Sequence, residues 1–319
     1  MKINKLLLIT ISTLLVCGMA NFTAAQDGPA TSPLVKQMYD GGWPSSKELK
    51  TVHEQFLLQR AVQSYMMTLP TLNVIGMRDG SEAEFGSGYN VLPIWKDRMD
   101  SRALVPTPNA DVIYSMSYLD LKETGPLVIY APPKVIGMFT DFYQRTLTDV
   151  GAAGPDRARG GLYLLLPPDY EGTVPGGYVT FKSKTYNVFL FFRTVLAQGK
   201  DGPDTKVAVQ TAERTRIYPL GSSESKRPKM QFPNGSGKRV NMMYPTDFSY
   251  WEKLKKYIDY EPIGAFLLEV RGMLALLGII KGQPFKPSPG VHIQRFKSQL
   301  VLGKSSSLKR LPFSMTRTL

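Results

Sequence analysis

A run of short strand-like segments, from about Arg102 to Phe192, constrains the fold of this chain more than any other feature. Apolar segments of strand length alternate there with turns that contain Gly and Pro, a pattern typical of an antiparallel sandwich or barrel. No segment of helix length intervenes, which argues against a parallel, doubly wound sheet. The segments are ALV, DVIYSMSYL, PLVIYAP, GMFTDFYQRTL, GLYLLLPP, GYVTFKS and YNVFLFFRTVL.

Helical patterns lie on both sides of this run. A helix is predicted from about Ser46 to Leu69. Ser45 and Glu48 match a capping box at its start, and Pro70 is expected to end it. The next stretch, GMRDGSEAEFGSGYN, has the composition of a glycine-rich loop. Further helices are predicted over residues 204–217, 247–260 and 264–280.

This order of elements predicts an α+β fold. Its core is expected to be an antiparallel β-sandwich or jelly-roll-like arrangement, with an N-terminal helix and C-terminal helices.

The first 25 residues have the pattern of a signal peptide. Lys2 and Lys5 precede an apolar stretch of about 15 residues, LLLITISTLLVCGMA, which is shorter than the roughly 20 residues that a membrane span needs. Small residues then predict cleavage near Ala25. We therefore expect a secreted or periplasmic protein. The alternatives are an uncleaved N-terminal segment, which would be its only membrane contact, and a lipid-modified Cys17.

Cysteine usage is consistent with this prediction. Cys17 is the only cysteine and lies within the predicted signal peptide. The processed chain would therefore have no disulfide, no thiol nucleophile and no cysteine-ligated zinc.

The net charge of +13 is concentrated near the C-terminal end. Residues 281–319 contain eight Lys and Arg and no Asp or Glu. Without them and the two lysines of the signal peptide, 29 basic residues remain against 26 acidic ones. The body therefore lacks the basic footprint of a nucleic-acid-binding protein, and no nucleic-acid partner is expected.

Four blocks of the sequence carry a family resemblance. They are TPNADVIYSMSYLDL, FTDFYQRTLTDVGAAGPDRARGGLYLLLPPDYEG, YNVFLFFRTVL and GIIKGQPFKP. In this order they resemble the bacterial exported proteins that carry domain of unknown function 1254. The resemblance covers about residues 45–287 and implies an exported domain without an assigned activity.

The chain departs from that family at its end. Family members usually continue into a second domain, domain of unknown function 1214, whereas residues 288–319 are basic and show no clear period. We expect a divergent tail from a truncated or frame-shifted gene; the alternative is a genuine basic tail that contacts anionic lipid. The predicted organisation is a signal peptide at 1–25, a polar lead at 26–44, the α+β domain at 45–287 and the tail at 288–319.

The sequence lacks several common catalytic motifs, namely H-E-x-x-H, a phosphate-binding loop and G-x-S-x-G. Its two histidines are His53, on the first predicted helix, and His292, in the tail. His53 is interpreted as an ordinary residue of an amphipathic helix. No metal or cofactor is predicted, although neighbouring carboxylates could hold a hard cation such as calcium.

Polar residues and a tyrosine near the strand ends are the candidate ligand-binding residues. They could cap turns through bonds to the backbone, or they could converge on a sheet-lined pocket for a small polar ligand or glycan. Regular alternation would place Asp141, Tyr143 and Arg145 on one face of a strand. The candidates are Asn109, Asp111, Tyr114, Asp141, Gln144, Asp149, Asp156, Arg157 and Arg193.

Two other classes of function stay open. A hydrolase of the glycoside type would need two of Asp111, Asp141, Asp149 and Asp156 to face each other at about 5 to 9 Å. The second alternative is a structural or interaction module without catalysis. No substrate, reaction or oligomeric state follows from these residues.

Overall fold

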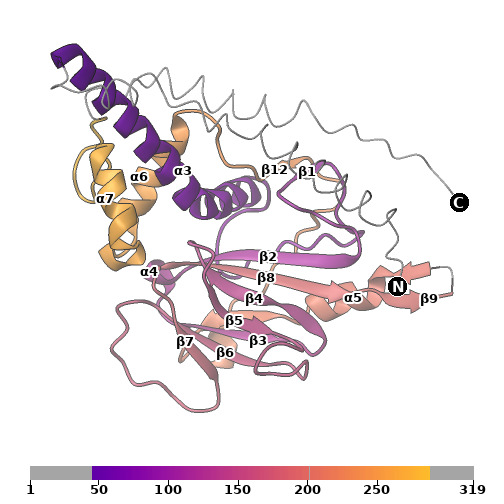
Figure 1. The fold of residues 1–319 in the computed structure, drawn as a ribbon. Coiled ribbons are helices and arrows are strands. Elements are labelled where there is room, and N and C mark those ends of the chain that lie inside the picture. The colour runs from indigo at the N-terminus through magenta and orange to yellow at the C-terminus, as the bar shows by residue number, and fades with distance from the viewer. Residues whose placement is uncertain (1–44, 201, 288–319) are drawn as a thin grey trace, which may run out of the picture. The chain divides into compact units, whose positions relative to one another are not determined.

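Two four-stranded sheets packed face to face form the centre of the fold (Figure 1). The computed structural model describes residues 45–200 and 202–287, so the predicted signal peptide, polar lead and basic tail lie outside the described residues. The chain divides into two compact units, residues 1–57 and 58–319. Of the first unit, only residues 45–57 are described, and they contain the start of helix α3 at Ser46. Ser45 N donates to Glu48 Oε2 (2.6 Å), as the capping box predicts. The following paragraphs concern the second unit.

The predicted strand run is confirmed. The first sheet has the order β2-β8-β4-β5 and is antiparallel throughout. The second has the order β11-β3-β6-β7 and is antiparallel except for the β6-β7 pair. The strands are β2 (Val112–Asp120), β3 (Leu127–Ala131), β4 (Val135–Asp141), β5 (Thr146–Val150), β6 (Gly161–Leu166), β7 (Val179–Lys182), β8 (Asn187–Val195) and β11 (Arg216–Pro219).

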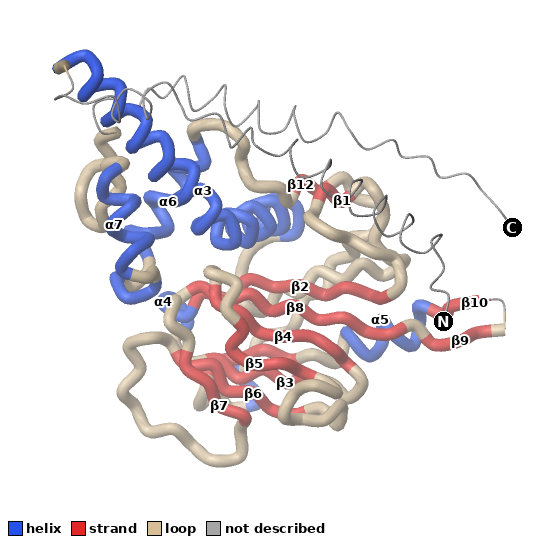
Figure 2. The backbone as a smooth tube through the Cα atoms, in the orientation of Figure 1, coloured by secondary structure: helices blue, strands red, loops and turns tan. Residues whose placement is uncertain are grey.

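The predicted α+β class is also confirmed. Figure 2 shows both helices and strands, and the short strand pairs β1-β12 and β9-β10 lie outside the two main sheets. The helices are α3 (Ser46–Phe85), α4 (Leu121–Thr124), α5 (Thr205–Ala212), α6 (Ser249–Tyr260) and α7 (Leu268–Leu276). The short strands are β1 (Ala103–Leu104), β9 (Ala197–Gly199), β10 (Gly202–Asp204) and β12 (Val240–Asn241). Within the described ranges, no helix is long and apolar enough to cross a membrane.

The first sheet is buried on both faces. Because side chains alternate along a strand, β8 directs Val188, Leu190 and Phe192 toward the second sheet. Phe189 and Phe191 lie on the opposite face and join an apolar cluster with residues of α3, α6 and α7. One sheet therefore separates two cores, one between the sheets and one beneath the helices.

Helix α3 is longer than predicted, because it continues through Pro70 to Phe85. A proline inside a helix lacks the N–H donor and crowds the preceding turn, so it kinks a helix that tertiary contacts hold together. Those contacts are present: Tyr143 Oη donates to the Met67 carbonyl (2.8 Å), and Gln144 Nε2 donates to the Pro70 carbonyl (2.9 Å). The β4–β5 turn thus binds α3 at its proline.

The prediction that Asp141, Tyr143 and Arg145 share one strand face is wrong, because β4 ends at Asp141 and β5 begins at Thr146. The intervening residues form a tight turn. Asp141 Oδ1 accepts from the backbone N–H groups of Tyr143 (2.9 Å) and Arg145 (3.0 Å), and Asp141 Oδ2 pairs with Arg145 Nε (2.7 Å). Asp141 is buried, and its role is to hold this turn.

Residues 76–85 of the predicted glycine-rich loop are instead the last part of α3, whereas residues 86–90 lie outside any helix. The glycines in this part of α3 serve close packing: a Cβ at Gly76 would lie 2.6 Å from Tyr244 N, and one at Gly80 would lie 2.0 Å from the Asn241 carbonyl oxygen. Only glycine allows the helix backbone to lie so close to the segment around β12.

Two other predicted helices are shorter than expected. Helix α5 ends at Ala212, and residues 216–219 form β11, because these residues pair with β3. Helix α7 covers only Leu268–Leu276 of the predicted 264–280.

A buried glutamate joins the end of α6 to the start of β8. Glu261 accepts hydrogen bonds from Tyr186 N (2.5 Å), Asn187 N (3.0 Å) and Asn187 Nδ2 (2.6 Å). Burial raises the pKa of Glu261 to about 7, although these three bonds favour the carboxylate. Lys281 Nζ donates to the Glu261 carbonyl oxygen (2.7 Å) at the same helix end.

We predict that Gly80→Ala destabilises the protein by about 1–3 kcal/mol, because overpacking against backbone outweighs the roughly 1 kcal/mol gain in helix propensity. Chemical denaturation checks this. Gly272→Ala in α7 is the matched control, since a Cβ there meets nothing within 4 Å. The control is expected to be neutral or stabilising. Equal effects of the two substitutions would contradict the close-packing role of Gly80.

We also predict that stability falls as pH rises from about 4.5 to about 7, because the folded state holds the Glu261 proton more tightly than the unfolded chain does. The stabilisation is fully present below the unfolded pKa and is lost as pH passes the folded pKa. With about 1.4 kcal/mol per pKa unit, the loss is on the order of 3 kcal/mol. Urea unfolding at several pH values should show a flatter profile for Glu261→Gln. The exposed control Glu171→Gln should retain the wild-type profile, and an unchanged profile for Glu261→Gln would contradict the prediction.

Candidate functional site

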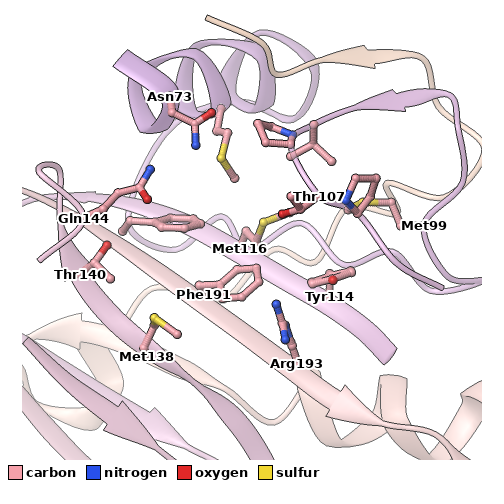
Figure 3. A pocket seen from close by; sticks show the side chains of 15 residues that line it. Asn73, Met99, Thr107, Tyr114, Met116, Met138, Thr140, Gln144, Phe191 and Arg193 are labelled. Carbon is pink, nitrogen blue, oxygen red and sulfur yellow. The ribbon is translucent and has the colours of Figure 1, made fainter. Parts of the chain in front are cut away.

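A cavity of about 240 Å³ lies between the first sheet and α3 (Figure 3). Its floor is the helix-facing side of β2, β4 and β8, and residues of α3 beyond Pro70 lie across from that floor. The segment before β2 and the β4–β5 turn complete the lining. Most lining side chains are methionine, proline, valine and phenylalanine. The polar and phenolic ones are Asn73, Thr107, Tyr114, Thr140, Gln144 and Arg193.

Strand register determines which side chains form the floor. Tyr114 on β2 lies opposite Arg193 on β8. Met138 on β4 lies opposite Phe191, which brings β4 and β8 together at the centre of the floor. Because alternate residues share a face, the floor follows directly from the pairing of the three strands.

Three buried polar atoms of the cavity residues make no hydrogen bond in the described part of the chain. They are Asn73 Oδ1 on α3, Thr140 Oγ1 on β4 and Arg193 Nε on β8. Other buried polar atoms also make no hydrogen bond to the described residues, among them Ser115 Oγ and Trp95 Nε1. Asn73, Thr140 and Arg193 differ from these residues in that their side chains line the same cavity. Protein atoms cover all three of the polar atoms named first, so the cavity is lined by other atoms of these side chains.

Arg193 gives the cavity a positive charge. Its guanidinium carbon lies 4.8 Å from the ring centroid of Phe191 and 5.5 Å from that of Tyr114, so the two rings support it. Within residues 45–200 and 202–287 it forms no ion pair, and no Asp or Glu lines the cavity. The site is therefore apolar in most of its surface and cationic at one point.

The rim of the cavity contains a strained residue. Thr107 has a φ of 51°, in the left-handed region that a β-branched residue rarely adopts. Such a conformation costs about 1–3 kcal/mol and is common near binding sites. Two residues on, Asn109 Oδ1 accepts from Asp111 N (3.1 Å) and caps the turn into β2. The Thr107–Asp111 stretch is thus both a cavity rim and a capped strand entry.

The structure brings together three of the nine candidate residues. Tyr114, Gln144 and Arg193 line the cavity, whereas the other six lie outside its lining. Asp111 and Arg157 are exposed, and Asp149 lies on β5 opposite Met138. Asn109 caps its turn, and Asp141 holds the β4–β5 turn.

Asp156 has a structural environment. It is buried and accepts from Gly151 N (2.7 Å), Gly160 N (3.1 Å) and Tyr163 Oη (2.8 Å), which organises the turn before β6. None of Asp111, Asp141, Asp149 and Asp156 lines the cavity. The cavity therefore offers no carboxylate pair for acid–base hydrolysis. Within the described ranges, no three His, Cys, Asp or Glu side chains cluster in a way that could hold a metal ion.

Sequence reasoning missed three polar residues of the cavity, namely Asn73, Thr107 and Thr140. Asn73 was not considered because the first helix was expected to end at Leu69. Thr140 could have been found from alternation, since it shares a strand face with Met138 and precedes Asp141.

Comparison with solved structures identifies a similar fold. The crystal structure of the VPA0106 protein from Vibrio parahaemolyticus superposes with a TM-score of 0.55 at 15% sequence identity, over 79% of this chain and 59% of that one. This chain thus spans less than two thirds of that protein's length. At this identity the likeness concerns the fold alone. A comparison with curated proteins finds no match.

The family comparison covers the two sheets. Residues 89–219 match the family model described as "Protein of unknown function (DUF1254)". These residues include β2 to β8 and β11, and with them the floor of the cavity. Residues 89–219 are therefore similar to this family, in agreement with the resemblance of the sequence blocks within them.

Proposed function

We propose that this is an exported protein that binds a small polar ligand in the cavity between the first sheet and α3. One observation carries the proposal: the Arg193 guanidinium, which forms no ion pair with the described residues, lines a mostly apolar cavity together with the polar side chains of Asn73, Thr140 and Gln144. A mostly apolar lining with a few convergent polar groups is the usual composition of a ligand site.

The size of the cavity limits the ligand. At about 240 Å³, it is smaller than the roughly 300–1,000 Å³ of sites for drug-sized molecules. A monosaccharide or a small organic molecule is therefore the expected class, rather than an extended glycan chain.

The site is built on regular elements, which favours binding without large rearrangement. Three paired strands form its floor, and the hydrogen bonds from Tyr143 and Gln144 fix α3 at Pro70. A preformed site loses less conformational entropy on binding, so modest contacts can support specific recognition.

We predict that a thermal-shift screen of the full chain finds stabilising small molecules among monosaccharides, organic acids and their neutral analogues. A ligand at about 100 times its Kd adds about 2.7 kcal/mol to the free energy of unfolding, which raises Tm by several degrees. Met138→Trp, which places a bulky ring on the cavity floor, should abolish these shifts. Met66→Trp is the control, because Met66 is 67% exposed and lies outside the lining. A screen without any shift, or shifts that persist in Met138→Trp, would contradict binding in this cavity.

The export part of the proposal rests on the N-terminal pattern of residues 1–25. We predict that the chain, expressed in a Gram-negative bacterium, appears in the periplasmic fraction with a mass that corresponds to cleavage near Ala25. Replacing several leucines of the apolar stretch by charged residues should retain the full-length chain in the cytoplasm. Cytoplasmic, uncleaved wild-type protein would contradict export.

A further inference from the structure

We infer that the ligand is an organic monocarboxylate with an apolar body, whose carboxylate pairs with Arg193. This inference rests on the proposed function and adds the chemical class of the ligand. It follows from the charge of the cavity, the orientation of the guanidinium and the nature of the remaining lining.

The charge of the lining favours an anion. Arg193 is its one ionisable side chain apart from the Tyr114 phenol, and it has no acidic partner within the described residues. A charge that is partly withdrawn from water without a counter-ion is costly, and a bound anion offsets that cost. A neutral sugar would leave the guanidinium without a counter-charge.

The aromatic rings that pack against the Arg193 guanidinium favour a planar anion with two acceptor oxygens. The Phe191 and Tyr114 rings restrict Arg193. Its Nε is covered by protein atoms, so a ligand would pair with the two terminal guanidinium nitrogens. Arginine binds carboxylates through two parallel N–H···O bonds, and a restrained side chain loses less rotamer freedom in doing so. Figure 3 shows the Arg193 side chain rising from the floor toward the labelled cavity residues.

The single positive charge favours a carboxylate over a phosphate. A phosphate monoester carries about −1.5 to −2 charges at pH 7 and is commonly bound by several cations or by a helix N-terminus. Here the residues that α3 contributes, Asn73 and Met77, lie in the interior of the helix, and no second cation lines the cavity. One guanidinium matches the charge of one carboxylate.

The rest of the lining describes the body of the ligand. Met77, Met99, Met116 and Met138 surround the cavity with flexible, polarizable side chains, which adapt to hydrocarbon groups of varied shape. Asn73 and Gln144 lie away from the floor and offer amides to a second polar group of the ligand (Figure 3). A short aliphatic or aromatic acid with a hydroxyl or carbonyl group at its far end fits both features.

Matched pairs of acids and primary amides test this inference. Isothermal titration of the full chain would use hexanoate with hexanamide, benzoate with benzamide, and 4-hydroxybenzoate with 4-hydroxybenzamide. We expect at least one acid to bind and its amide to bind at least tenfold more weakly, a difference of about 1.4 kcal/mol. Arg193→Gln should weaken binding of that acid by tenfold or more and leave binding of the amide unchanged. Arg239→Gln, which replaces an exposed arginine outside the lining, should change neither.

The outcomes separate this inference from the proposed function. If amides bind as tightly as acids, or Arg193→Gln binds acids like wild type, the carboxylate assignment is overturned. Cavity binding still stands in that case, provided that Met138→Trp abolishes it. If no probe binds and the wider screen gives no shift, both are overturned.

A second variant covers the case in which Arg193→Gln does not fold, as judged by circular dichroism and Tm. Arg193→Lys keeps the charge and loses the planar fork, so we expect weaker binding of the acid with retained preference over the amide. Wild-type affinity in Arg193→Lys would contradict the two-pronged pairing.

Discussion

Burial of the first sheet on both faces is the constraint on which the rest of the structure depends. β2 and β8 contribute alternate side chains to the core between the sheets and to the core beneath the helices. A register shift by one residue would exchange the two faces and move Arg193 into the core between the sheets. The same pairing that builds the two cores therefore also places Arg193 opposite Tyr114 on the cavity floor.

The helical side of the cavity depends on two departures from ordinary helix chemistry. Pro70 lies inside α3, and side chains of the β4–β5 turn bond to the Met67 and Pro70 carbonyls. Gly76 and Gly80 then allow the helix to lie against the backbone around β12. Asn73 lies between these two anchors, so its position over the cavity is fixed on both sides.

The strands could be predicted from sequence because their signals are local: alternation, β-branched and aromatic residues, and turns with Gly and Pro. The extent of α3 could not, because Pro70 and the glycines that follow it normally end a helix, and only contacts with Gln144 and Asn241 reverse that preference. Likewise Ile217 fits a helix or a strand until its pairing with Ile129 is known.

The site could be predicted in part for a related reason. Tyr114 and Arg193 could be selected as polar or aromatic residues near strand ends, but their convergence with Asn73 depends on the tertiary fold.

The treatment of buried polar groups distinguishes the cavity from the scaffold around it. Asp141, Asp156 and Glu261 are buried, and each accepts at least three hydrogen bonds, so these acids strengthen turns and helix–strand junctions. Arg193, in contrast, has aromatic support and no counter-charge among the described residues. Arg193 is half-buried, and withdrawing part of a charge from water without a counter-charge costs free energy. The proposed recognition of a ligand therefore rests on this restrained arginine, which faces an open cavity.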